Sequence, residues 1–326
     1  MGDKPPTRTW GIDLARPPST LHRMETGSHQ SEACASGAPM EAVAPPVFDV
    51  IPVPPGAPHA PLVYASPHSG GQYPDRMLEA LRLDPSVLRG SEDSLVDSLI
   101  APAPAGGATV IHARVARAFV DLNREPWELD PAMFEDELPD FARARTARVA
   151  AGLGAIARVA GGKEIYRRKL TFAEAKARIE TVHQPYHDAL TRLLAQARAA
   201  HGVALLVDWH SMPSAAAQGP GRRGPCDIVL GDRFGAACAP AITALVEKAF
   251  IELGYRCVRN APYAGGYTTE HYGRPSRRTH ALQVEINRAL YLDEATRVAN
   301  DGFARLSRDI GTVTARLAGF DWATLR

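Results

Sequence analysis

Two histidines lie where predicted core strands give way to polar residues. His210 follows the apolar run 203–207, which has the length of a strand buried on both faces. His68 follows a second predicted strand at 61–66. Ligands of open α/β sheets bind at the carboxyl ends of the strands. Both histidines are therefore candidate metal ligands or catalytic groups, although a hydrogen-bonded histidine in an ordinary turn fits the same pattern.

Carboxylates that could complete such a site occur in two segments. The cluster 91–97 contains Glu92 and Asp93 at the head of a predicted helix, where an acidic residue serves either as a helix cap or as a metal ligand. The later segment 281–287 alternates in period two and places Glu285 on one face with two amide side chains. That face is either the solvent side of an edge strand or the wall of a cleft in which Glu285 acts as a base.

An asparagine and an arginine follow a third predicted strand, at 118–122. Asn123 and Arg124 together could hold a carboxylate through paired donors. A plain ion pair between Arg124 and Glu125 is the alternative.

Two glycine-interrupted segments are predicted to be loops. Residues 139–163 are rich in arginine and alanine, and they form either a mobile loop that carries Arg158 over a site or a solvated basic surface. Residues 263–273 contain two adjacent glycines and His271. They form either a flexible binding loop or a turn that needs glycine for its geometry.

A second pair of histidines lies in a predicted helix that starts with a capping box at 171–174 and runs to Ala200. His183 and His187 have the i, i+4 spacing that can place two metal ligands on one helical face. A pair without metal is favoured, because Pro185 between them breaks the helix or starts a new first turn. The glutamate that follows the first histidine in metalloprotease helices is also missing.

The alternation of elements predicts a layered α/β fold, with strands at 226–230 and 255–258 on either side of a helix at about 235–253. Two histidines at strand ends, an acidic residue between them and a late glutamate are the parts of a catalytic zinc site. Such a site has three protein ligands and leaves a fourth position for water. Amide hydrolysis is the matching reaction class.

Composition limits the classes of partner. The 326 residues include 37 basic and 36 acidic side chains, so no overall field favours nucleic acid or an anionic membrane, and a small-molecule partner is expected. The four cysteines form no C-x-x-C pair, and no apolar run approaches the roughly 18 residues of a membrane span. We expect a cytoplasmic protein with a mobile, proline-rich segment at 1–47 and one catalytic domain at 48–326.

From about Phe48 to Glu294 the chain resembles the N-formylglutamate amidohydrolases. The ordered motifs that carry this resemblance include SPHSG at 66–70, SEDSLVD at 91–97, FVDLNREPWELDP at 119–131, DWHSMP at 208–213, YAGGYTTEHYG at 263–273 and HALQVEINRALYLDE at 280–294.

The resemblance implies a three-layer α/β/α fold with a central mixed sheet, similar to zinc carboxypeptidases and aspartoacylase. It implies zinc held by His68, His210 and a carboxylate. Carboxypeptidase-like relatives supply that carboxylate three residues after the first histidine, where this chain has Gly71. Asp93 is therefore the preferred third ligand and Glu92 the alternative.

The resemblance also implies roles around the metal. Glu285 would be the general base and acid, and Asp208 and Asn287 would orient the site from behind. The substrate pocket would be lined by Asn123, Arg124, Arg158, Gly266, Tyr267 and His271.

The implied reaction is zinc-dependent hydrolysis of N-formyl-L-glutamate to L-glutamate and formate, as in histidine degradation. The chain departs from the sequences we associate with that enzyme at Glu270, where a basic residue is common, and this change could alter selection for a dicarboxylate. Another N-acyl amino acid or small peptide-like amide is an alternative substrate. A non-catalytic binding or regulatory module on the same fold is an alternative of a different class.

Overall fold

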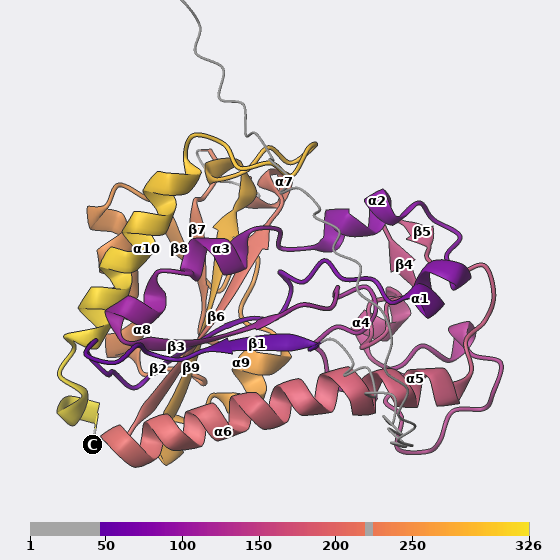
Figure 1. Cartoon of the computed structure of the whole chain (residues 1–326), viewed down its shortest axis with the longest axis horizontal. Coiled ribbons are helices and arrows are strands. Elements are labelled where there is room, and N and C mark those ends of the chain that lie inside the picture. The colour runs from indigo at the N-terminus through magenta and orange to yellow at the C-terminus, as the bar shows by residue number, and fades with distance from the viewer. Residues whose placement is uncertain (1–45, 219–223, 326) are drawn as a thin grey trace, which may run out of the picture. The chain divides into compact units, whose positions relative to one another are not determined.

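The structure, a computed structural model, describes residues 46–218 and 224–325 (Figure 1). The proline-rich segment predicted at 1–47 lies outside the described residues as far as residue 45. The described residues belong to one compact unit that starts at Pro45. None of their helices is both long enough and apolar enough to cross a membrane.

A seven-stranded sheet with the order β1-β3-β2-β6-β9-β7-β8 forms the centre of the fold. Its strands are β1 (Phe48–Ile51), β2 (Leu62–Ser66), β3 (Ala108–Ala113), β6 (Ala204–Met212), β7 (Ile228–Gly231), β8 (Cys257–Arg259) and β9 (Thr279–Asn287). The β1/β3 and β7/β9 pairs are antiparallel, and all other neighbours are parallel. A separate ribbon consists of β4 (Val159–Ala160) and β5 (Lys163–Glu164).

Helices cover both faces of this sheet (Figure 1). α6 (Gln184–His201) contributes Leu190 and Leu194 to a core on one face. α3 (Val96–Ile100), α8 (Pro240–Glu252) and α10 (Phe303–Ala318) pack in a second core on the other face. The remaining helices are α1 (Asp75–Ala80), α2 (Pro85–Leu88), α4 (Ala147–Ala150), α5 (Phe172–Arg178), α7 (Ser214–Ala217) and α9 (Tyr267–Tyr272).

The central strand β6 shows why its sequence is apolar at successive positions. Ala204 and Leu206 belong to the core beneath α6, whereas Leu205 and Val207 belong to the core on the opposite face. Neighbouring residues of a strand point to opposite faces, so a strand between two helical layers needs an apolar residue at every position. The predicted three-layer α/β/α fold with a mixed sheet is confirmed.

The prediction that this strand ends before the polar residues is wrong. β6 continues to Met212 with every residue buried, because β9 pairs with it along its whole length, from Thr279 to Asn287. Asp208 and His210 therefore lie within a central strand, not in the turn after it. β9 itself lies between β6 and β7, so it is not an edge strand.

Two other local predictions also change. Residues 118–122 form no strand; they are a buried irregular segment whose backbone finds other partners. In the loop predicted at 263–273, residues 267–272 form the short helix α9. The capping box of Thr171 and Glu174 is confirmed at the start of α5.

Candidate active site

Sheet register brings the central polar residues together. On the parallel strands β6 and β9, Asp208 lies beside Gln283, and His210 lies beside Glu285. Alternate residues share a face of the sheet, so these four side chains emerge on one side near the carboxyl ends of both strands. His68 follows β2, the neighbour of β6 on its other side, and reaches the same edge.

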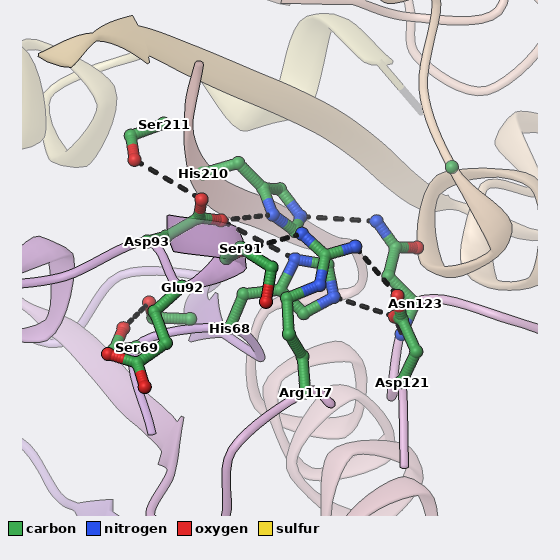
Figure 2. A network of polar contacts seen from close by, with 12 residues as sticks. His68, Ser69, Ser91, Glu92, Asp93, Arg117, Asp121, Asn123, His210 and Ser211 are labelled. Atoms are coloured by element: carbon green, nitrogen blue, oxygen red, sulfur yellow. Dashed lines mark hydrogen bonds and ion pairs between the residues drawn. The ribbon is translucent and has the colours of Figure 1, made fainter. Parts of the chain in front are cut away.

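Two histidines and an aspartate converge there. His68, Asp93 and His210 form a buried group that could hold a metal ion, and their candidate ligand atoms all lie within 4.8 Å of one another. Asp93 Oδ2 lies 3.4 Å from His68 Nδ1 and 3.0 Å from His210 Nδ1. Figure 2 shows the dashed lines that join the Asp93 carboxylate to both rings. Ligands about 2.0 Å from a tetrahedral ion lie about 3.3 Å apart. The two distances from Asp93 Oδ2 are close to this ligand–ligand spacing, so the group could hold a metal ion.

The far side of each histidine ring is held by a second carboxylate. His68 Nε2 lies 2.7 Å from Asp121 Oδ1, and His210 Nε2 lies 3.0 Å from Asp208 Oδ2. Metal-binding histidines commonly have the other ring nitrogen anchored in this way, which sets the tautomer and the ring orientation. Among the described residues, the buried His68 Nδ1 has no hydrogen-bond partner. Both rings thus present Nδ1 toward Asp93.

Asp93 is positioned by both its backbone and its side chain. Its amide donates to the carbonyl of His68, and its Oδ1 accepts hydrogen bonds from Ser211 Oγ and Arg288 Nη2 at 3.2 and 3.1 Å. Burial opposes ionisation of Asp93, but its contacts with His210 and His68 and the charges of these two histidines together outweigh burial and hold its pKa well below the usual range. The carboxylate is therefore charged when the site is assembled.

The alternative ligand, Glu92, points elsewhere. Its carboxylate accepts hydrogen bonds from Tyr73 Oη at 2.5 Å and from Arg89 Nε at 3.4 Å. It is not part of the group that could hold a metal. Of the two adjacent carboxylates, the structure brings Asp93 to the histidines.

Glu285 lies in the same cavity as this group. Its Oε1 accepts a hydrogen bond from Gln283 Nε2 at 2.8 Å. Burial raises the pKa of Glu285 to about 7, partly opposed by the charge of His210 and assisted by that of Asp93. A carboxylate with a pKa near neutrality is suited to accept and return a proton at neutral pH.

The cavity beside these groups has a volume of about 570 Å³. Asn123, Arg124 and Gly266 line it, as the sequence predicts for substrate-binding residues. Asn123 Nδ2 lies 3.2 Å from His210 Nε2, and its Oδ1 accepts from the amide of Thr268. A Cβ atom at position 266 would collide with the side-chain amide of Asn123, so a larger residue there would require Asn123 to move.

Three other predicted binding residues lie outside this cavity. Arg158 forms an ion pair with Asp130 at 2.6 Å. Tyr267 and His271 stack with ring centroids 5.0 Å apart and line a neighbouring cavity of about 620 Å³. Asn287, predicted to orient the site from behind, accepts from the amide of Ala289 at the end of β9.

Several residues of the cavity wall are not anticipated from the sequence. Asp121 lies in a motif that was interpreted as a strand, yet it joins His68 to Arg117, whose Nη2 is 2.6 Å from Asp121 Oδ2. Three further arginines, which sequence analysis did not single out, also line the cavity: Arg148, Arg233 and Arg288. These three arginines lie in or near the sequence motifs of the family. No local sequence pattern shows that they face one cavity.

The second histidine pair is part of the scaffold. His187 Nε2 lies 2.8 Å from the carbonyl of Leu122, and His183 Nε2 lies 3.0 Å from that of Arg124. Burial lowers the pKa of His187 to about 3, with a further contribution from His183. Neutral imidazoles at these positions can donate to the two carbonyls. Neither residue belongs to the group that could hold a metal.

Comparison with known proteins shows to which family the chain belongs. A family model described as N-formylglutamate amidohydrolase matches residues 60–292. The chain belongs to the N-formylglutamate amidohydrolase family. The N-formylglutamate deformylase of Pseudomonas putida is 31% identical over 237 residues, which are 72% of this chain and 82% of the relative. That of Pseudomonas aeruginosa is 34% identical over 191 residues, 58% of this chain and 66% of the relative.

Solved structures agree with this membership of the N-formylglutamate amidohydrolase family. The crystal structure of N-formylglutamate amidohydrolase from Ralstonia eutropha JMP134 has a TM-score of 0.78 and 39% sequence identity, covering 84% of this chain and 97% of that chain. A gene product of Agrobacterium tumefaciens shares the fold, with a TM-score of 0.58 and 19% identity over 84% of this chain and 95% of that one.

Proposed function

We propose that this protein is a zinc-dependent amidohydrolase that converts N-formyl-L-glutamate and water into L-glutamate and formate. The observation that carries the proposal is the convergence of His68, Asp93 and His210 beside Glu285 in an arginine-rich cavity. The names of the relatives from Pseudomonas and Ralstonia support the choice of substrate.

The donor set fits zinc. Two imidazole nitrogens and one carboxylate oxygen, with anchored rings behind them, are a common three-ligand set for catalytic zinc and leave a position for water. When bound, the ion would polarise the formyl oxygen and lower the pKa of that water. His68, His210 and Asp93 would hold it, while Asp121 and Asp208 keep the two rings in orientation.

Glu285 is the proposed proton carrier. It takes a proton from the attacking water as the oxygen adds to the formyl carbon. It then returns that proton to the amide nitrogen as the C–N bond breaks, so formate and the free amine of glutamate are released. A pKa near 7 lets one carboxylate perform both steps. Gln283, which donates to Glu285, holds its carboxylate in place.

Asn123 and Arg124 are the proposed site for the α-carboxylate of the substrate. Arg124 Nη1 and Nε donate to the carbonyls of Asn123 and Leu153, so its guanidinium is oriented without a carboxylate partner among the ion pairs of the described residues. A guanidinium held in this way can bind an incoming carboxylate with little rearrangement.

The test combines metal analysis with kinetics on a small panel. We expect the purified protein to contain about one zinc per chain and to give its highest kcat/KM with N-formyl-L-glutamate, compared with N-acetyl-L-glutamate and N-formyl-L-leucine. A higher kcat/KM for another N-acyl amino acid would reassign the substrate. A zinc-loaded protein without amidase activity on any of them would instead support a binding or regulatory module.

A further inference from the structure

The five arginines of the cavity differ in how far their charges are already balanced. Arg288 is fully used: it donates to Asp93, to Ser211 and to the carbonyls of residues 90 and 92. Arg117 is paired with Asp121. These two arginines hold the metal site and have little capacity left for a substrate.

Arg233 is also paired. Its Nη2 lies 2.9 Å from Glu270 Oε2, and the Glu270 side chain is 59% exposed. The departure at Glu270 therefore provides a partner for Arg233, which lines the catalytic cavity, while Glu270 lines the neighbouring one. A substrate carboxylate would have to displace Glu270 to use this arginine.

Arg124 and Arg148 are the two cations left with the least compensation. In the described part of the chain, the hydrogen bonds of Arg124 go to backbone carbonyls, and Asp121 and Glu128 act on it through their charges without a hydrogen bond. The nearest carboxylate of Arg148 is Glu128, at 3.9 Å, which is beyond hydrogen-bond distance. Glu128 instead accepts a hydrogen bond from Thr146. Neither guanidinium has a hydrogen-bonded carboxylate, so the two can accept the two negative charges of a dicarboxylate.

The backbone fixes these two arginines relative to each other. The amide of Leu153 donates to the carbonyl of Arg148, and the carbonyl of Leu153 accepts from Arg124 Nε at 3.2 Å. Arg148 itself lies on α4, which Thr146 caps by accepting from the amide of Val149. Arg148 also lines the neighbouring cavity, so it stands at the boundary of the catalytic one.

We propose that Arg148 binds the side-chain carboxylate of the substrate while Arg124 binds its α-carboxylate, and that Arg148 thereby makes the enzyme selective for acidic N-formyl amino acids. This inference rests on the proposed function and assigns the second charge of the dicarboxylate to one residue. Arg148 is a binding residue and takes no part in proton transfer.

The test compares N-formyl-L-glutamate with N-formyl-L-glutamine, which has the same shape but no side-chain charge. Arg148→Gln should lower kcat/KM for N-formyl-L-glutamate by about 10- to 100-fold, because one charge-assisted contact is lost. It should change kcat/KM for N-formyl-L-glutamine by less than about threefold. Arg148→Lys should recover part of the loss, since lysine keeps the charge but not the two-pronged geometry.

Arg145→Gln is the matched control, because Arg145 is exposed, lies three residues earlier and does not line the catalytic cavity. It should leave both substrates unaffected. Activity on N-formyl-L-glutamine also reports whether each variant is folded.

The outcomes separate the two proposals. A wild-type protein that hydrolyses neither substrate contradicts the proposed function, and the inference with it. A wild-type protein that prefers N-formyl-L-glutamate, with the preference unchanged in Arg148→Gln, contradicts only the role of Arg148. Loss of the preference in Arg233→Gln instead would assign the side-chain carboxylate to Arg233.

Discussion

The molecule contains two buried histidine pairs with nearly the same ring separation and different surroundings. The rings of His68 and His210 have centroids 4.7 Å apart, and those of His183 and His187 are 4.3 Å apart. The first pair has Asp93 between its Nδ1 atoms, whereas the second pair faces backbone carbonyls. Within the described residues, only the first pair belongs to a group that could hold a metal ion. The two pairs differ in the carboxylate that the first pair shares, and not in how close the rings are.

The second pair supports the first through the irregular segment 118–124. Buried backbone carbonyls that lie outside a sheet need donors from elsewhere. His187 and His183 lie beside the carbonyls of residues 122 and 124, and Arg178 donates to that of residue 119 at 3.1 Å. The same segment carries Asp121 and Asn123, whose side chains contact the first histidine pair.

A local irregularity of the helix allows this arrangement. Residues Ile179–His183 form a π-helical turn between α5 and α6. In a regular α-helix, Arg178 and His183 would point about 140° apart, because five residues at 100° each rotate about 140° beyond one full turn. The wider turn, with i to i+5 hydrogen bonds, brings residues five apart nearer to one face, and such turns are frequent near functional sites.

The largest difference between the two histidine pairs should appear when one member of the His68/His210 pair is removed. His210→Ala should abolish zinc binding and lower kcat/KM by about 1,000-fold or more, because the polarising ion and its water are lost. Zinc content by mass spectrometry and activity on N-formyl-L-glutamate are the two measurements. A variant that keeps stoichiometric zinc would show that His210 is not a ligand.

The next test separates metal binding from proton transfer. Glu285→Gln should retain zinc but lower kcat by about 100- to 10,000-fold, because the amide cannot accept a proton. Zinc content and single-turnover rates measure the two properties independently. Activity close to that of the wild type would assign the base to another residue.

Removing a member of the second pair should have a smaller effect of another kind. His187→Leu leaves the carbonyl of Leu122 without its imidazole donor, so we expect about a 10-fold loss of kcat and a lower Tm, with zinc affinity within about threefold of wild type. His187→Gln can still donate and should recover part of both losses. If the fold loss of zinc affinity in His187→Leu exceeds the fold loss of kcat, the two histidine pairs are not functionally distinct.

The smallest expected effect is a pH dependence of stability in the metal-free protein. Burial raises the pKa of Glu285 from 4.5 to about 7, so the folded state binds this proton more tightly than the unfolded state does. This group's contribution to stability is therefore full below about pH 4.5 and is lost as the pH rises through 7. Urea unfolding of wild type and Glu285→Gln between pH 5 and 8 measures the difference between their slopes.

A steeper loss of stability with rising pH in the wild type is the expected result for the metal-free form. Zinc should remove most of the difference, because a cation beside the carboxylate favours its charged form. Identical slopes in the metal-free wild type and variant would show that Glu285 titrates normally.

Much of the fold could be predicted from sequence because its signals are local. The all-apolar runs, the capping box of α5 and the alternation of strand and helix depend on residues close in the chain. The positions of His68 and His210 relative to the apolar runs marked them for the same reason, and the period-two pattern of 281–287 marked Glu285. The strand predicted at 118–122 is wrong because its composition is that of a buried strand, while its carbonyls lie beside side chains distant in sequence, those of Tyr166, Arg178 and His187.

Local patterns along the chain were enough to predict a layered α/β protein with two candidate histidines and a late glutamate at the carboxyl edge of its sheet. The folded chain was needed to show that Asp93 rather than Glu92 meets those histidines, that Asp121 anchors His68, and that Arg148 faces the cavity. Adjacent residues on extended backbone point in different directions, and charges distant in sequence interact only after the chain has brought them within a few ångströms.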